Sequence, residues 1–101
     1  MKTVPVMLPN RVPITCPSPQ GELKLAATNI VFGKYKDDQG KEHSGWTAAL
    51  SMMVGEDRET YKAVKVFAGK SVLYGKFAVD VQRFDSSRLG MVVLAEVALP
   101  E

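Results

Sequence analysis

Few side chains in this 101-residue chain could do chemistry, and His43 is the single histidine. It lies between Glu42 and Ser44 in a polar stretch. A Ser-His-Asp site needs a positioned nucleophile, an oriented imidazole and an oxyanion hole, and closeness in sequence supplies none of these. We therefore interpret His43 as a solvated loop residue.

Cys16, the single cysteine, is the other candidate nucleophile, alone or paired with His43. It lies between Thr15 and Pro17, where nothing indicates a helix N-terminus that would lower the pKa of the thiol. A small buried or half-buried thiol is the simpler expectation. We predict that the chain is not an enzyme and has no catalytic residue; an enzyme using His43 or Cys16 ranks last of three hypotheses.

Metal and nucleotide sites are not indicated either. A structural zinc site needs about four Cys or His ligands, and the chain has one of each. The acidic loop 37–42 lacks the alternating oxygen ligands of an EF-hand, and Lys41 places a positive charge there. Gly69-Lys70-Ser71 matches only the end of a P-loop. We expect no metal and no cofactor.

Lysines and aromatic residues alternate between Tyr61 and Phe84, where Asp80 is the sole acid. Aromatic rings stack on bases and lysines follow phosphates, so such a face could bind single-stranded nucleic acid weakly. This is the alternative function, with a candidate binding face made of Tyr61, Lys62, Lys65, Lys70, Tyr74 and Lys76. An ordinary solvated sheet face, with lysines that prevent edge pairing, is the simpler interpretation.

Composition limits the classes of partner. The formal charge of +2, from 13 basic and 11 acidic residues, is too small for general attraction to phosphate polymers or acidic lipids. One cysteine cannot form an internal disulfide, which favours a reducing compartment. No apolar run is long enough for a signal peptide or a membrane span. We expect a soluble, cytoplasmic protein with no membrane partner.

The elements that must position these residues are most clearly indicated in the C-terminal third. Between Lys70 and Leu99, apolar residues recur at every second position in two runs separated by a turn-like segment, 85–88. This alternation is typical of half-buried strands. The residues expected to face the core are Leu73, Phe77, Val79, Val81, Leu89, Met91, Val93, Ala95, Val97 and Leu99; those expected to face outward are Val72, Tyr74, Lys76 and Ala78.

Val92 and Leu94 make the second face of the last strand apolar as well. Such a strand is either central and covered on both sides, or part of an exposed patch that needs a partner. Both possibilities remain open from the sequence.

The middle of the chain predicts further strands. Leu23 and Leu25 occupy odd-numbered positions, whereas Ile30 and Phe32 occupy even-numbered ones. Because alternate residues of a strand face opposite sides, this change predicts two short strands with a bulge or break between them. The polar stretch 35–45 indicates a hairpin loop.

Two segments of the middle region fit more than one element. Residues 46–54 fit both strand and helix spacing, and the flanking turns favour a strand. Over 57–68, a helix capped by Asp57 and Gly69 competes with a strand, which Val64, Val66 and Phe67 favour.

Five of the six prolines fall within residues 1–20. Proline removes a backbone donor, so this segment cannot be a regular helix or a central strand. We expect an extended Pro-rich arm over 1–20, with an edge strand as the alternative, and a single β-domain over 21–101. The arm could lie across the domain or reach a neighbouring subunit.

Together these patterns predict an all-β fold, a small antiparallel β-sandwich or partly open β-barrel of about six to eight short strands. By elimination, the leading function is a small non-enzymatic domain that binds another protein or copies of itself. The doubly apolar last strand and the Pro-rich arm motivate this hypothesis.

Overall fold

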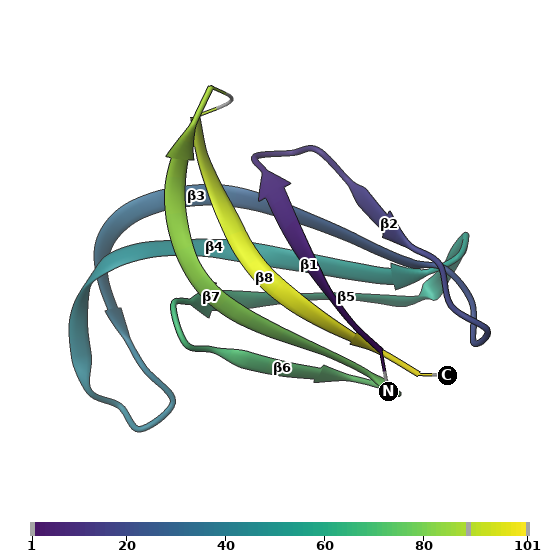
Figure 1. The fold of residues 1–101 in the computed structure, drawn as a ribbon. Helices are drawn as coiled ribbons and strands as arrows, with labels where there is room; N and C mark the ends of the chain where they lie inside the picture. The colour runs from purple at the N-terminus through teal and green to yellow at the C-terminus, as the bar shows by residue number, and fades with distance from the viewer. Residues whose placement is uncertain (1, 89, 101) are drawn as a thin grey trace.

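A computed structural model describes residues 2–88 and 90–100, and these residues form an all-β fold. Antiparallel strands build two four-stranded sheets in a sandwich-like arrangement (Figure 1). Sheet A has the order β1-β8-β7-β6 and sheet B the order β2-β3-β4-β5. The strands are β1 (Lys2–Pro9), β2 (Ile14–Cys16), β3 (Leu23–Lys36), β4 (Glu42–Val54), β5 (Asp57–Phe67), β6 (Ser71–Tyr74), β7 (Phe77–Ser87) and β8 (Gly90–Leu99).

One hydrophobic core joins the inward faces of the two sheets. The expected alternation of the last strand is confirmed from Val93 to Leu99, where every second side chain is buried; Met91 is half-buried, and Leu89 lies outside the described residues. The strand prediction for 46–54 is also confirmed, because alternate side chains of β4 are buried. These are Ala48, Leu50 and Met52.

The Pro-rich segment does not form a separate arm, and the edge-strand alternative is confirmed. Residues 2–9 form β1, which pairs with β8, and residues 14–16 form β2, which pairs with β3. Both are edge strands. An edge strand has an open side where no backbone donor is needed, which accommodates Pro5 and Pro9 within β1 and Pro13 and Pro17 on either side of β2. Between them the chain crosses from sheet A to sheet B at Arg11, which has a φ of 65° and donates its backbone N–H to the Ala27 carbonyl at 2.8 Å.

The prediction of which β6 side chains face the core is wrong. Val72 is buried, with 6% of its surface exposed, whereas Leu73 is 78% exposed. The reason is the two-residue turn Gly75–Lys76, which places Tyr74 opposite Phe77. Directly opposed residues share a face, so the inward-facing residues change from even-numbered in β6 to odd-numbered in β7 across this turn. Tyr74 therefore points inward with Phe77 and Val72.

In β3, one strand replaces the two that were predicted. The register shifts between Thr28 and Val31, with Asn29 at a φ of 52°. A bulge of this kind lets one strand change its inward parity, which accounts for the two opposed apolar sets. The β3–β4 hairpin is confirmed, but its turn is shorter than predicted, spanning 37–41.

Two further segments resolve into strand. Residues 57–67 form β5, so the strand interpretation is confirmed over the competing helix. Residues 85–87, expected to be a turn, extend β7, with Asp85 opposite Val92.

Candidate functional site

Three of the six residues predicted to form a binding face lie on β5, the edge strand of sheet B. Lys65 lies opposite Ala49, on the outer side of sheet B. Tyr61 is 59% exposed and lines a hollow on the same side. Lys62 lies opposite the buried Met52, so it belongs to the other parity, at the open edge. Tyr61 and Lys65 therefore lie on one surface, and Lys62 does not belong to it.

Tyr74 is engaged inside the fold. Its hydroxyl donates a hydrogen bond to the Thr60 carbonyl, and its ring lies 6.5 Å from that of Phe77. The Thr60 hydroxyl accepts from the Val54 N–H at 2.9 Å and donates to the Asp57 carbonyl at 2.6 Å. These bonds tie β6 to β5 and close one side of the sandwich.

Lys70 and Lys76 occupy two different turns. The ammonium of Lys70 lies 2.5 Å from Asp38 Oδ1 and 5.8 Å from the centre of the Phe67 ring, so it connects the β3–β4 turn to the β5–β6 turn. Lys76 is exposed in the β6–β7 turn. The six residues thus do not form one continuous surface.

His43 is part of an aromatic stack that the sequence did not suggest. Tyr35 stacks on His43, with ring centres 5.4 Å apart, and on Phe67, at 5.0 Å. The stack crosses Gly45, where a Cβ would lie 3.4 Å from the Tyr35 ring. The only signal that could have found it is the hairpin register, which places Tyr35 opposite His43.

Asp37 holds the imidazole of His43 in place. His43 Nε2 lies 2.8 Å from Asp37 Oδ2, and a carboxylate only accepts, so the ring donates. The Asp37 Oδ1 accepts the backbone N–H groups of Gln39 and Lys41 at 2.9 Å each. These bonds, that from His43 first, lower the pKa of the Asp37 carboxyl.

The lowered pKa of Asp37 gives a testable pH dependence. Its stabilising contribution is complete above the ordinary carboxyl pKa of about 4 and is lost as the pH falls through the lowered value. Asp37→Asn should therefore lower the melting temperature at pH 6, and its deficit relative to the parent chain should shrink at lower pH. Thermal unfolding of the variant and the parent chain at pH 6 and at more acidic pH is the measurement. If the melting temperature of the variant lies equally far below that of the parent at both pH values, the assignment is contradicted.

The structure separates the candidate thiol from the imidazole. Cys16 pairs with Leu23, at the end of sheet B opposite to His43. Its side chain is buried, as expected, and burial raises the pKa of the thiol. Among the described residues, no cysteine, serine or threonine side chain is hydrogen-bonded to Asp37 or His43.

The outer face of sheet B has an apolar floor of small side chains. The strand register places Ala26, Ser51 and Ala63 side by side across three strands, with Ala49 in the adjacent row. No strand among the described residues covers this face.

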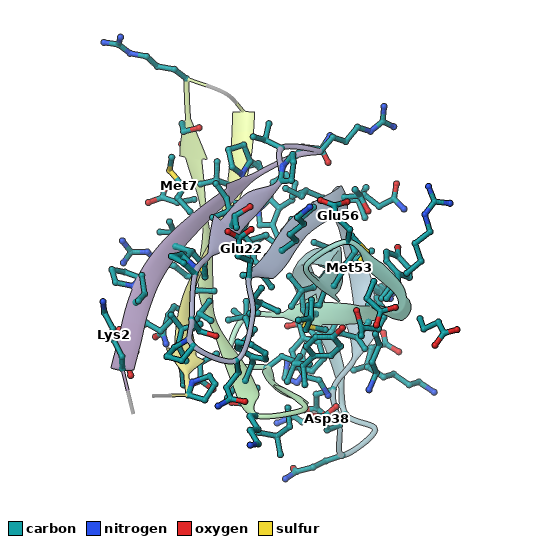
Figure 2. All side chains as sticks on the ribbon, turned by 90° about the vertical axis from the view of Figure 1, so that its right-hand side faces the viewer. Lys2, Met7, Glu22, Asp38, Met53 and Glu56 are labelled. Carbon is teal, nitrogen blue, oxygen red and sulfur yellow. The ribbon has the colours of Figure 1, made fainter. Side chains whose placement is uncertain are left out.

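Larger side chains stand at the two ends of this floor. Tyr61 and Met53 border a hollow of about 170 Å³, and Val31, 54% exposed, borders one of about 340 Å³. In the side view, Met53 lies on the opposite side of the molecule from Met7 of sheet A (Figure 2). We call the surface made by Ala26, Val31, Ala49, Ser51, Met53, Tyr61, Ala63 and Lys65 the outer B face.

Two lysines with different surroundings lie at the outer B face, Lys65 within it and Lys24 at its border. The Lys24 ammonium donates to Glu56 and lowers the pKa of that carboxyl. Lys65 has no ion-pair partner within the described part of the chain. The unpaired positive charge of this face is therefore that of Lys65.

No known family model matches this chain, and no curated protein or solved structure is significantly similar to it. Among residues 2–88 and 90–100, no group of three or more His, Cys, Asp or Glu side chains is placed to hold a metal ion. The same residues include no helix long and apolar enough to cross a bilayer.

Proposed function

We propose that this chain is a small non-enzymatic binding domain that docks onto another protein through the outer B face. The observation that carries the proposal is the apolar floor of this face, left uncovered by the described strands while Val31 and Tyr61 stay more than half exposed. Exposed apolar surface gains roughly 25 cal/mol for each Å² removed from water, so a contiguous patch favours association.

The chemistry of the face favours a protein partner over single-stranded nucleic acid. Three alanine methyls and the Ser51 side chain, whose hydroxyl is bonded to the Ala26 carbonyl, form the floor. A nucleic-acid platform needs several aromatic rings and several free cations instead. Of the six residues expected to form such a platform, Tyr74 is bonded to Thr60 and Lys70 to Asp38. Tyr61 and Lys65 are the two that share the outer B face. Nucleic-acid binding is therefore the second candidate.

Site-specific photo-crosslinking tests this function. A photoreactive residue at Ala63, in the cells that express the chain, should give discrete adducts with protein. The same residue at Gln39, in the exposed β3–β4 turn, is the matched control and should give none. Adding Ala49→Arg should remove the Ala63 adducts, because the arginine fills the floor beside Ala63 without touching the core.

The outcome of the crosslinking decides between the two functions. Adducts at Ala63 that nuclease digests would replace the protein-binding proposal with the nucleic-acid one. Adducts that persist unchanged with Ala49→Arg, or their complete absence at Ala63, would refute docking at this face. The circular-dichroism spectrum and melting temperature of each variant show that the fold is retained.

A further inference from the structure

The outer face of sheet A is also partly apolar, and its charge is opposite to that of the outer B face. Met7 and Leu94 lie opposite each other in β1 and β8 and line a hollow of about 620 Å³. The exposed Leu73 lies on the same side, at the β6 edge. We call the surface made by Pro5, Met7, Leu73, Asp80, Leu94 and Glu96 the outer A face.

Two carboxylates lie side by side at the centre of the outer A face. The register of β7 and β8 places Asp80 directly opposite Glu96. Like charges at opposed positions destabilise a sheet. Ser71 Oγ donates to Asp80 at 2.5 Å, but Glu96 has no ion-pair partner within the described part of the chain. This pair leaves an excess of negative charge where a cation from outside could bind.

The charges that border the outer A face, those of Arg83 and Asp85, do not cancel this excess. Arg83 lies 3.9 Å from Asp85 on the same side of β7, so one guanidinium stands against three carboxylates, a balance of −2. The outer B face presents the unpaired Lys65 instead. The two faces of one molecule are therefore complementary in charge, and each is unfavourable against itself.

We propose that the protein which docks on the outer B face is a second copy of this chain, presenting its outer A face. This inference rests on the proposed function and names its partner. Lys65 of one copy lies against the Asp80–Glu96 pair of the next, and the apolar side chains around these charges lose water together. Two outer B faces would oppose lysine to lysine, and two outer A faces carboxylates to carboxylates, so the contact is head to tail.

Head-to-tail contacts leave one face of each kind free on a dimer. Assembly then continues into a ring or a chain rather than stopping at two. The expected behaviour is a mass that rises with protein concentration. Association should also weaken from about 0.05 to about 0.5 M salt, because exposed charges are screened over shorter distances at the higher salt.

Sedimentation of charge-reversed variants tests this arrangement. Lys65→Glu alone and Glu96→Lys alone should each reduce the association constant at least tenfold. An equimolar mixture of the two should associate again, because each variant retains the face that the other has lost. Lys62→Glu, on the same strand but with the other parity, is the matched control and should associate like the parent chain.

These outcomes test the identity of the partner separately from the proposed docking function. A parent chain that stays monomeric at every concentration, or a mixture that does not recover association, overturns the second copy as partner. Protein adducts at Ala63 would still support docking on the outer B face in that case, with a different protein bound. If Lys65→Glu weakens association but Glu96→Lys does not, the contact is not head to tail and the inference fails.

Discussion

Leu50→Ala should lower the free energy of unfolding by about 3 kcal/mol and the melting temperature by roughly 10–20 °C. Leu50 is fully buried near the middle of β4, opposite Ala27 on one side and Val64 on the other. Removing its branched end loses the burial of those atoms and leaves a cavity that neighbouring strands cannot close. Urea unfolding at 25 °C is the measurement.

Leu73→Ala is the matched control, since it makes the same chemical change at a position that is 78% exposed. Its free energy of unfolding should stay within about 0.5 kcal/mol of the parent. Comparable losses in the two variants would mean that the β6–β7 register is wrong, because Leu73 would then face the core.

Gly21→Ala is the second substitution with a large expected effect, a loss of about 2 kcal/mol. Gly21 has a φ of 112°, which an L-residue rarely adopts, and a Cβ there would lie 2.9 Å from Val54 Cγ1. The turn is fixed on both sides, because the Gly21 N–H donates to the Ser18 carbonyl and Ser18 Oγ donates to the Gly21 carbonyl. Because these bonds fix the turn, a small movement cannot relieve either the backbone strain at residue 21 or the clash with Val54.

Gly33→Ala provides the comparison for this substitution. Gly33 lies within β3 outside the left-handed region, and no atom lies within 4 Å of its Cβ position. The alanine there should be neutral or slightly stabilising, because it reduces the conformational entropy of the unfolded chain. Calorimetry of both variants checks the contrast, and equal losses would contradict the turn geometry at Gly21.

Both pairs of variants bear on the candidate interface. The outer A and outer B faces are the backs of the two sheets whose inward sides make the core. A variant that only loosens the core should weaken association through unfolding, whereas Lys65→Glu should weaken it while the melting temperature of the dilute, monomeric protein stays unchanged. Measuring both quantities separates the two causes.

Part of the candidate interface could be anticipated from the residues alone. Tyr61 and Lys65 belonged to the predicted binding face, and both lie on the outer B face. Leu94, marked by the apolar second face of the last strand, lines the hollow of the outer A face. Tyr74 and Lys70 were grouped with them because they are near in sequence, yet their partners are Thr60 of β5 and Asp38 of the β3–β4 turn.

Over residues 46–54 and 57–68 the amino-acid sequence favoured a strand but left a helix open as the alternative. By itself it indicated the all-β class and which side chains of β7 and β8 alternate between core and surface. This follows because the two-residue period is a local property of one strand. Only the tertiary structure decided the facing of β6, since a two-residue turn reverses the parity that a continuous pattern suggests. It also decided that the prolines within β1 and those flanking β2 lie at sheet edges, because edge positions depend on which strands pair. The stack of Tyr35, His43 and Phe67 and the opposition of Asp80 to Glu96 arise in the same way, from the register between strands whose residues are distant in sequence.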